Sequence, residues 1–306
     1  MKNSSWRKKV GEITHNVCRG CPICDGHACR GEVPGMGGAG DGSTFIANVR
    51  SWNALPLPES QALPELGVAP MCGVADNMGN PISEEGFHYA LVKGAKEAGI
   101  LSCIGDGAPD HKLYDGVKAL EENNCKGAGI IKPYPDLEII NRYHRISHAL
   151  TAAGIDIDAF GIATMNGKVV LEDKTAQQLK RLKQQFHVPF IIKGIYSLEQ
   201  VPLVAEVKPD IIVISNHGGR ILPGLPGIGG LCAAIAEACR KYTGEIWVDS
   251  GIRTLEHLYK AKAAGADRVL IGRPFIQGVV ALGPEGIAAV LAEQFGIHTR
   301  AGCIQA

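Results

Sequence analysis

Residues 210–230, DIIVISNHGGRILPGLPGIGG, join a short apolar run to a glycine-rich loop. The run from Asp210 to Ser215 is rich in β-branched residues and predicts a buried strand. A loop that follows such a strand lies at the carboxyl edge of a sheet, where α/β enzymes place their reactive side chains. His217 offers a proton acceptor near neutral pH, and Arg220 offers a planar cation for a carboxylate or phosphate. The alternative, two solvated side chains at a capped turn, stays open from this stretch alone.

Outward from this stretch, strand-like and helical patterns alternate along the chain. Apolar runs predict strands at Gly67–Met71, Ile100–Ile104, Gly127–Tyr134, Ala159–Thr164, Pro189–Ile195, Asp210–Ser215, Glu245–Asp249 and Arg268–Ile271. Helical periodicity predicts helices at Ser83–Ala98, Lys112–Asn123, Asp136–Ala153, Lys174–Phe186, Leu198–Val207, Gly229–Tyr242 and Leu255–Ala264, with a last helix near Glu285–Phe295. Glycines at the expected helix ends are Gly99, Gly154 and Gly265. The pattern predicts an α/β fold, a (β/α)8 TIM barrel, with an open doubly wound sheet as the alternative.

Composition excludes several classes of protein. The 306 residues carry 31 basic and 31 acidic side chains, so no overall charge favours nucleic acid or an anionic membrane. No apolar run is long enough to span a bilayer, and the N-terminus lacks the apolar core of a secretory signal. Six of the ten cysteines are scattered singly through apolar segments. We therefore expect a cytoplasmic protein without a disulfide framework.

The first part of the chain is expected to stand apart from the barrel. Residues 1–66 are interpreted as a cysteine-rich N-terminal extension and connector, and residues 67–306 as the barrel. The GMGGAGDG run at 35–42 is interpreted as a loop, because no strand precedes it. Pro56, Pro58 and Pro64 break any long element in the connector, which is taken as residues 43–66.

Polar side chains follow most of the predicted strands, where a barrel enzyme collects its active site. The segments after the last two strands, Asp249–Arg253 and Gly272–Arg273, combine glycines with arginines. Backbone N–H groups, a helix N-terminus and guanidinium groups form phosphate pockets at this position in barrels. A phosphorylated ligand held there, with a ring reaching toward Lys193 and His217, predicts FMN.

Four motifs carry a family resemblance. IIKGI (191–195), ISNHGGR (214–220), VDSGIR (248–253) and VLIGRPF (269–275) resemble the FMN-dependent 2-hydroxy acid oxidases and dehydrogenases, the glycolate oxidase and lactate oxidase family. The likeness continues more faintly through residues 37–52, 69–70 and 132–134. It implies oxidation of a 2-hydroxy acid to the 2-oxo acid by hydride transfer to flavin N5, and a homotetramer.

The resemblance also implies roles for individual residues. His217 would be the catalytic base, Arg220 would pair with the substrate carboxylate, and Lys193 would stabilise negative charge at flavin N1 and the C2 oxygen. Tyr134 would border the flavin and the substrate. The residues expected to contact FMN are Ala69, Pro70, Lys132, Lys193, Ser215, His217, Asp249, Ser250, Gly251, Arg253, Gly272 and Arg273.

Three departures from the family pattern affect the expected substrate site. Pro34 stands where the family has a tyrosine, and Ala163–Asn166 has no counterpart of the aspartate that supports the histidine. A second substrate-binding arginine is also missing, with Lys168 the nearest cation. Alternative functions are a flavin-binding redox protein without hydroxy acid turnover, and an enzyme similar to the FMN-dependent isopentenyl diphosphate isomerases. The substrate and the electron acceptor are left open.

Cys18, Cys21, Cys24 and Cys29 have the spacing C-x2-C-x2-C-x4-C. Four thiols this close in sequence can surround one tetrahedral zinc ion or an iron–sulfur cluster. Our hypothesis is a [4Fe–4S] cluster near the flavin that serves as an electron exit, with structural zinc as the alternative. Four unliganded thiols are the remaining interpretation.

Overall fold

Eight parallel strands form a nearly closed barrel in the computed structural model, which describes residues 5–14, 42–162, 165–300 and 303–305. The strand order is β1-β8-β7-β6-β5-β4-β3-β2, and two single bridges, Gly67–Leu101 and Met71–Ile104, join β1 to the β2 side. The strands are β1 Glu65–Val68, β2 Cys103–Gly105, β3 Gly127–Ile131, β4 Leu150–Asp156, β5 Phe190–Ile195, β6 Ile211–Ile214, β7 Glu245–Val248 and β8 Arg268–Ile271. The pairing of β8 with β1 confirms the predicted (β/α)8 barrel and excludes the open sheet.

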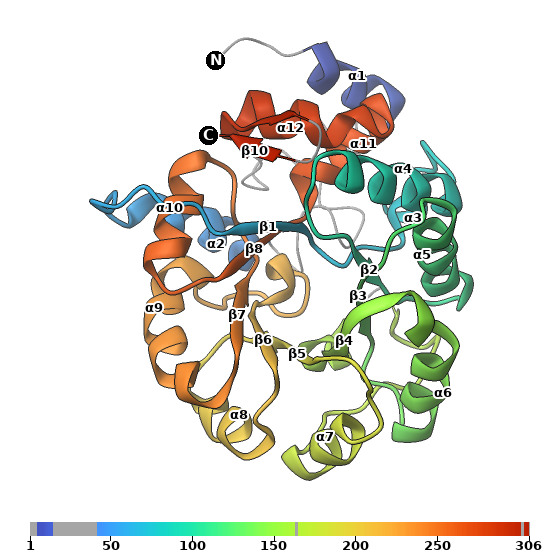
Figure 1. Cartoon of the computed structure of the whole chain (residues 1–306), viewed down its shortest axis with the longest axis vertical. Helices are drawn as coiled ribbons and strands as arrows, with labels where there is room; N and C mark the ends of the chain where they lie inside the picture. Colours follow the sequence, from blue (N-terminus) through green and yellow to red (C-terminus); the bar gives the residue numbers. More distant parts are fainter. Residues whose placement is uncertain (1–4, 15–41, 163–164, 301–302, 306) are drawn as a thin grey trace.

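Helices surround the ring of strands (Figure 1). They are α3 Val74–Asn77, α4 Glu84–Glu97, α5 His111–Glu122, α6 Asp136–Ile146, α7 Ala176–Lys183, α8 Val201–Val207, α9 Ile228–Cys239, α10 Leu255–Ala263, α11 Arg273–Leu282 and α12 Glu285–Phe295. Short 3-10 turns are η1 Ser147–Ala149, η2 Ile157–Gly161, η4 Leu198–Gln200, η5 His217–Gly219 and η6 Arg240–Tyr242. A terminal hairpin pairs β9, His298–Arg300, with β10, Cys303–Gln305. Gly99 and Gly265 have φ values of 69° and 98° just beyond α4 and α10, which confirms two predicted helix ends.

The core has two apolar layers. Side chains inside the barrel form the smaller layer, which includes Ile130, Ile191 and Trp247. The larger layer lies between strands and helices and also contains Trp6 and Trp52. These two tryptophans belong to helices that precede the barrel in sequence, α1 (Ser5–Ile13) and α2 (Ser43–Ala54). The described parts of the N-terminal region therefore pack on the barrel.

One expected connector and one segment without a predicted element contain helices. The expected connector at 43–66 begins with α2, because its prolines lie only at position 56 and beyond, where the helix has already ended. The segment after β8 forms α11, with Pro274 at a position in the first turn where a missing N–H costs no helical hydrogen bond. Both helices reach the carboxyl edge of the barrel, so both bear on the site.

The largest correction concerns the fourth strand. The sequence predicts a helix at 136–153 and a strand at 159–164, whereas α6 ends at Ile146 and β4 spans Leu150–Asp156. Gly154 was expected to cap the helix but lies inside β4, where a Cβ atom would lie 1.9 Å from the Ile191 carbonyl oxygen. The alanines of this segment favour a helix locally, but the segment pairs with β3 and β5 and therefore forms a strand. Asp156 thereby becomes the last residue of a barrel strand.

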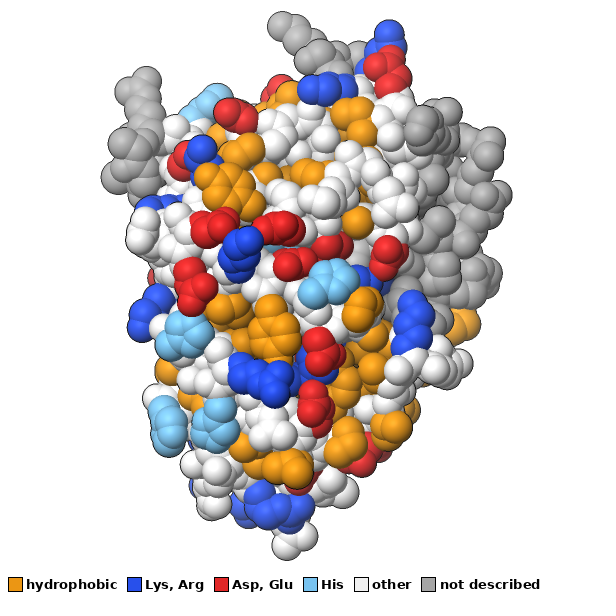
Figure 2. All heavy atoms as spheres, turned by 90° about the vertical axis from the view of Figure 1, so that its right-hand side faces the viewer, with side chains coloured by type: hydrophobic (Ala, Val, Ile, Leu, Met, Phe, Trp, Pro, Cys, Tyr) orange, Lys and Arg blue, Asp and Glu red, His pale blue; other side chains and the backbone are white. Residues whose placement is uncertain are grey.

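The outer face over α4, α5 and α6 carries interspersed acidic and basic side chains (Figure 2). Lys118, for example, lies between Glu85 and Glu122. Such exposed pairs contribute little to stability. Among the described residues, none of the helices combines the length and apolar character that crossing a bilayer requires.

Candidate active site

Two adjoining cavities open at the carboxyl ends of the strands. The first has about 760 Å³ of empty space and lies beside the ends of β1, β7 and β8. The second has about 860 Å³ and lies beside the ends of β2 and β3. The residues that line both cavities are Pro70, Cys72, Asn77, His217 and Arg220. The HGGR segment singled out in the sequence therefore lies where the two cavities meet.

Glycines and arginines line one part of the first cavity. Gly251 has a φ of 88°, and a Cβ atom there would lie 2.6 Å from the backbone of Asn48, so a side chain would be strained. The guanidinium groups of Arg253 and Arg273 lie 5.7 Å and 4.0 Å from the centroid of the Phe45 ring. Arg273 also begins α11, whose first N–H groups lack partners within the helix. This arrangement provides the donors and positive charge that a phosphate group requires.

Lys193 is buried at the end of β5 and also lines the first cavity. Its Nζ lies 3.1 Å from Asp156 Oδ1, 3.1 Å from Ser215 Oγ and 3.7 Å from Asp249 Oδ2. Burial by itself would lower the pKa of Lys193, but the charges of Asp156 and Asp249 raise it above its usual value. The site therefore holds a fixed positive charge at this wall of the cavity.

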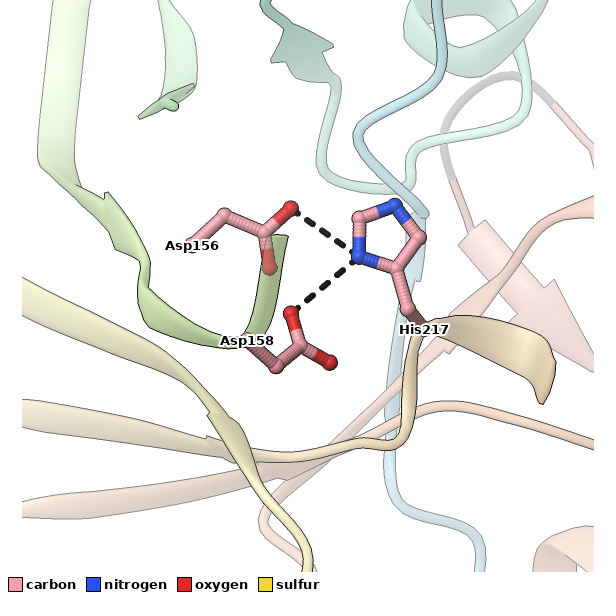
Figure 3. Close-up of side chains that lie close together, drawn as sticks. All are labelled: Asp156, Asp158 and His217. Atoms are coloured by element: carbon pink, nitrogen blue, oxygen red, sulfur yellow. Dashed lines mark hydrogen bonds and ion pairs between the residues drawn. The ribbon is translucent and has the colours of Figure 1, made fainter. Parts of the chain in front are cut away.

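His217 is held by two carboxyl groups on one side of its ring (Figure 3). Its Nδ1 lies 3.3 Å from Asp156 Oδ2 and 3.2 Å from Asp158 Oδ1. The expectation that this histidine lacks a supporting acid is wrong. The acid was expected at 163–166, at the end of the predicted strand 159–164. The fourth strand, β4, ends earlier, at Asp156, and Asp158 lies in η2.

Burial and the two carboxyl groups determine the protonation of this cluster. Burial lowers the pKa of His217 well below its usual value, so the imidazole is neutral at neutral pH. Burial would raise the pKa of Asp156, but its interaction with the His217 ring and the positive charges of Lys132 and Lys193 outweigh burial and lower the pKa. Burial and the charge of Asp156 raise the pKa of Asp158. The pair thus combines one carboxylate with one carboxyl group that tends to keep its proton.

This cluster is organised around ion pairs instead of a metal ion. Asp156, Asp158 and His217 offer ligand atoms that lie within 4.8 Å of one another. Both oxygens of Asp156, however, already contact lysine ammonium groups, Lys132 on Oδ2 at 2.8 Å and Lys193 on Oδ1 at 3.1 Å. Two ammonium groups in contact with one carboxylate oppose the binding of a further cation.

Arg220 is a half-buried cation that no carboxylate of the described residues neutralises by direct contact. Its Nε is buried without a hydrogen-bond partner in the described part of the chain. The nearby acids Asp156 and Asp158 are engaged with His217. Buried polar groups are normally paired, so the guanidinium is suited to an anion from outside the chain.

The structure separates two residues that the sequence placed together. Lys132 lines the second cavity, with Asp106 accepting a hydrogen bond from its backbone N–H. Tyr134 lines neither cavity: its ring packs under the Arg142 guanidinium at 4.2 Å, and its buried hydroxyl has no partner among the described residues. Ala69 and Pro70 line the first cavity, whereas Ser215 lines neither cavity and accepts a hydrogen bond from Lys193.

Sequence reasoning missed the contribution of α2 to the site. Asn48 exchanges two side-chain hydrogen bonds with Asn216, at 2.8 Å and 2.9 Å. Trp52 Nε1 donates to the Ser250 carbonyl oxygen at 2.9 Å. These contacts hold the loops after β6 and β7 in place. The sequence feature that could have indicated them is the faint family likeness at residues 37–52.

Cys18, Cys21, Cys24 and Cys29, Pro34 and the glycine-rich run through residue 41 lie outside the described residues. The proposed metal site of the four cysteines therefore stays a prediction from the sequence.

Comparison with known proteins places the chain among flavin enzymes. The family model described as FMN-dependent dehydrogenase matches residues 135–293, slightly more than half of the chain. A 4-hydroxymandelate oxidase from Amycolatopsis orientalis is 27% identical over 241 residues, covering 66% of this chain and 66% of that protein. An L-lactate oxidase from Roseobacter sp. (strain GAI101) is 37% identical over 117 residues, covering 38% and 31%. The chain thus matches less than two thirds of the length of either relative.

Solved structures agree on the fold. A mandelate oxidase with (S)-2-phenylpropionate has a TM-score of 0.68 at 20% identity, covering 93% of this chain and 89% of that one. A mandelate oxidase variant with benzoyl-formic acid has a TM-score of 0.70 at 20% identity, covering 93% and 90%. At this identity the likeness extends to the fold alone.

Proposed function

Because this chain belongs to the FMN-dependent dehydrogenase family, we propose that it binds FMN in the first cavity and oxidises a 2-hydroxy acid, or a similar small carboxylate, in the second. One observation carries the proposal: a neutral histidine lies where the two cavities meet, together with an arginine that has no carboxylate partner among the described residues. A 2-hydroxy acid offers one group to each of them, a hydroxyl proton to His217 and a carboxylate to Arg220.

The residues of the first cavity fit FMN. Ser250, Gly251, Arg253, Gly272 and Arg273 would hold the phosphate, and Lys193 would supply positive charge beside the ring system. When bound there, FMN would supply the acceptor, at N5, for the equivalent of a hydride from the 2-carbon of the substrate.

The protein contributes binding and proton transfer. Arg220 orients the substrate through its carboxylate, and His217 takes the hydroxyl proton at Nε2, the ring nitrogen that the carboxyl groups leave unoccupied. Asp156 stabilises the imidazolium that forms and holds the ring in place. An anaerobic absorption spectrum recorded before and after addition of a panel of 2-hydroxy acids tests this function. A spectrum that no member of the panel bleaches would count against it.

Arg273→Ala is expected to weaken FMN binding by about 1.5–3 kcal/mol, roughly 10- to 150-fold, because it removes a charge-assisted contact to the phosphate. Flavin released from the unaltered protein and identified by mass should be FMN. Fluorescence titration of the apoprotein measures the affinity. Arg240→Ala is the matched control, since Arg240 is an exposed arginine paired with Asp267. Recovery of FAD, or equal FMN affinity in the two variants, would contradict the assignment of the phosphate site.

For the four N-terminal cysteines we propose a metal centre, with a [4Fe–4S] cluster as the first candidate and zinc as the second. The support is their spacing in the sequence. Iron, sulfide and zinc are measured on anaerobically purified protein and on a Cys21→Ser variant. About four irons and four sulfides per chain, lost in the variant, would support the cluster. One zinc would make the site structural, and neither metal would end the idea of an electron exit through these residues.

A further inference from the structure

Lys132 lies beside Asp156 and approaches Nε2, the ring nitrogen of His217 that neither carboxyl group contacts. Its Nζ is 3.5 Å from His217 Nε2, while Asp156 and Asp158 contact Nδ1. Figure 3 shows Nε2 pointing away from both acids. The lysine is almost completely buried, with 7% of its surface exposed, and its Nζ is anchored to Asp156 Oδ2 at 2.8 Å. An ammonium group is therefore fixed beside the ring nitrogen that would receive the substrate proton.

The chemistry of an ammonium group restricts the tautomer of the ring. A lysine ammonium carries three donors and no acceptor, so Nε2 can only accept from it. The proton of a neutral ring then resides on Nδ1, which donates to Asp158 Oδ1 at 3.2 Å and also lies 3.3 Å from Asp156 Oδ2. A second proton on Nε2 would bring two positive charges within 3.5 Å of each other in a buried site.

We propose that Lys132 is a positioning residue that keeps His217 in the neutral tautomer with its lone pair on Nε2, facing the second cavity. The inference rests on the proposed function for its consequence, which is a base that stays active below the usual pKa of histidine. The contact at 3.5 Å is long, whereas the contact to Asp156 at 2.8 Å is short. Asp156 thus holds the lysine, and a substrate hydroxyl can compete for Nε2.

Charged groups from several elements face His217, and they act in different directions. Asp156 from β4 favours the protonated ring, while burial and the charges of Lys132 and Lys193 disfavour it. Asp158 from η2 contacts Nδ1, and Arg220 lines the same cavities. Lys193 contacts the other oxygen of Asp156 and Ser215, and no contact joins it to the ring in the described structure. Among these cations, Lys132 is in contact with the ring nitrogen that reacts.

The titration of His217 in the flavin-loaded protein tests the inference without turnover. Histidine NMR reports the tautomer and the midpoint, and the signal of His217 is the one absent from a His217→Asn variant. We expect the Nδ1–H tautomer in the unaltered protein. In Lys132→Gln the midpoint should rise by about one to three pH units, because a like charge beside the ring is removed. Lys132→Arg keeps the charge and should stay near the unaltered value.

Lys174→Gln is the matched control, because Lys174 is equally buried and contacts two carboxylates, Asp136 and Glu172, at 2.9 Å each. Its removal should leave the titration of His217 unchanged. In the kinetics, the acidic limb of the kcat/KM profile should move to higher pH in Lys132→Gln, by the same amount as the NMR midpoint, with the rate at high pH largely retained.

Three results would overturn the inference: an Nε2–H tautomer in the unaltered protein, an unchanged midpoint in Lys132→Gln, or a loss of kcat/KM that is uniform at all pH values. The last would make Lys132 a direct ligand of the substrate. If the midpoint shifts as expected but no 2-hydroxy acid reduces the flavin, the proposed function fails and the role of Lys132 toward His217 stands.

Discussion

His217→Asn is expected to bind flavin normally and to reduce it at least about 100-fold more slowly with any 2-hydroxy acid that the unaltered protein oxidises. The asparagine amide can still donate to Asp156 and Asp158, so the buried carboxyl groups keep a partner. It cannot accept the hydroxyl proton, because an amide is not basic near neutral pH. Anaerobic stopped-flow absorbance at the flavin band measures the rate.

The control for this variant is His148→Asn, which changes an exposed histidine paired with Glu121 on the outer surface. It should reduce flavin at the unaltered rate. Equal rates in His217→Asn and His148→Asn would assign the base to another residue. A variant that no longer retains flavin would instead show that His217 supports the first cavity, which it also lines.

Arg220→Met is expected to lower kcat/KM for a 2-hydroxy acid by about 2–5 kcal/mol, because the substrate carboxylate would enter the site without its partner. Arg220→Lys should recover only part of this loss, since a lysine cannot present two parallel N–H donors to one carboxylate. Steady-state kinetics with an artificial electron acceptor measures both variants. Arg240→Met serves as a control on the outer surface, where Arg240 pairs with Asp267.

A neutral substrate sharpens this test. The methyl ester of an active 2-hydroxy acid carries no negative charge, so Arg220→Met should turn it over about as fast as the unaltered protein does. If the variant loses ester and acid turnover equally, Arg220 acts on the shape of the site and not on the carboxylate. Loss of activity with the acid alone would favour the proposed role.

Those parts of the site that lie within a single loop could be predicted from the local sequence. Gly251, Arg253, Gly272 and Arg273 follow the last two strands directly, and the structure brings them to one cavity as expected. The same holds for His217 and Arg220, which follow β6 within one turn. Strand ends in a parallel barrel share one edge, so identifying a strand correctly places the residues that follow it.

The acids beside His217 were missed because the strand that leads to them was misplaced in the sequence. The segment LTAAGID is rich in alanine and has the composition of a helix end, yet it becomes β4 between two neighbouring strands. The predicted strand started at Ala159, nine residues after the true start at Leu150. Asp156 and Asp158 were therefore expected before the strand instead of at its carboxyl end. Lys132 and Tyr134 show a related limit. Residues two apart on a strand share a face, but β3 ends at Ile131, so strand alternation does not fix the directions of these two side chains and only Lys132 reaches a cavity.

The sequence by itself determined the alternation of strands and helices, the glycine and arginine motifs after β7 and β8, and the family resemblance. These features depend on residues close together in the chain, where periodicity and turn chemistry act. Only the tertiary structure decided that α2 braces the site, that Asp156 and Asp158 flank His217, and that Lys132 faces Nε2. Those contacts join residues from 59 to 198 positions apart, and closing the barrel, not local propensity, brings them together.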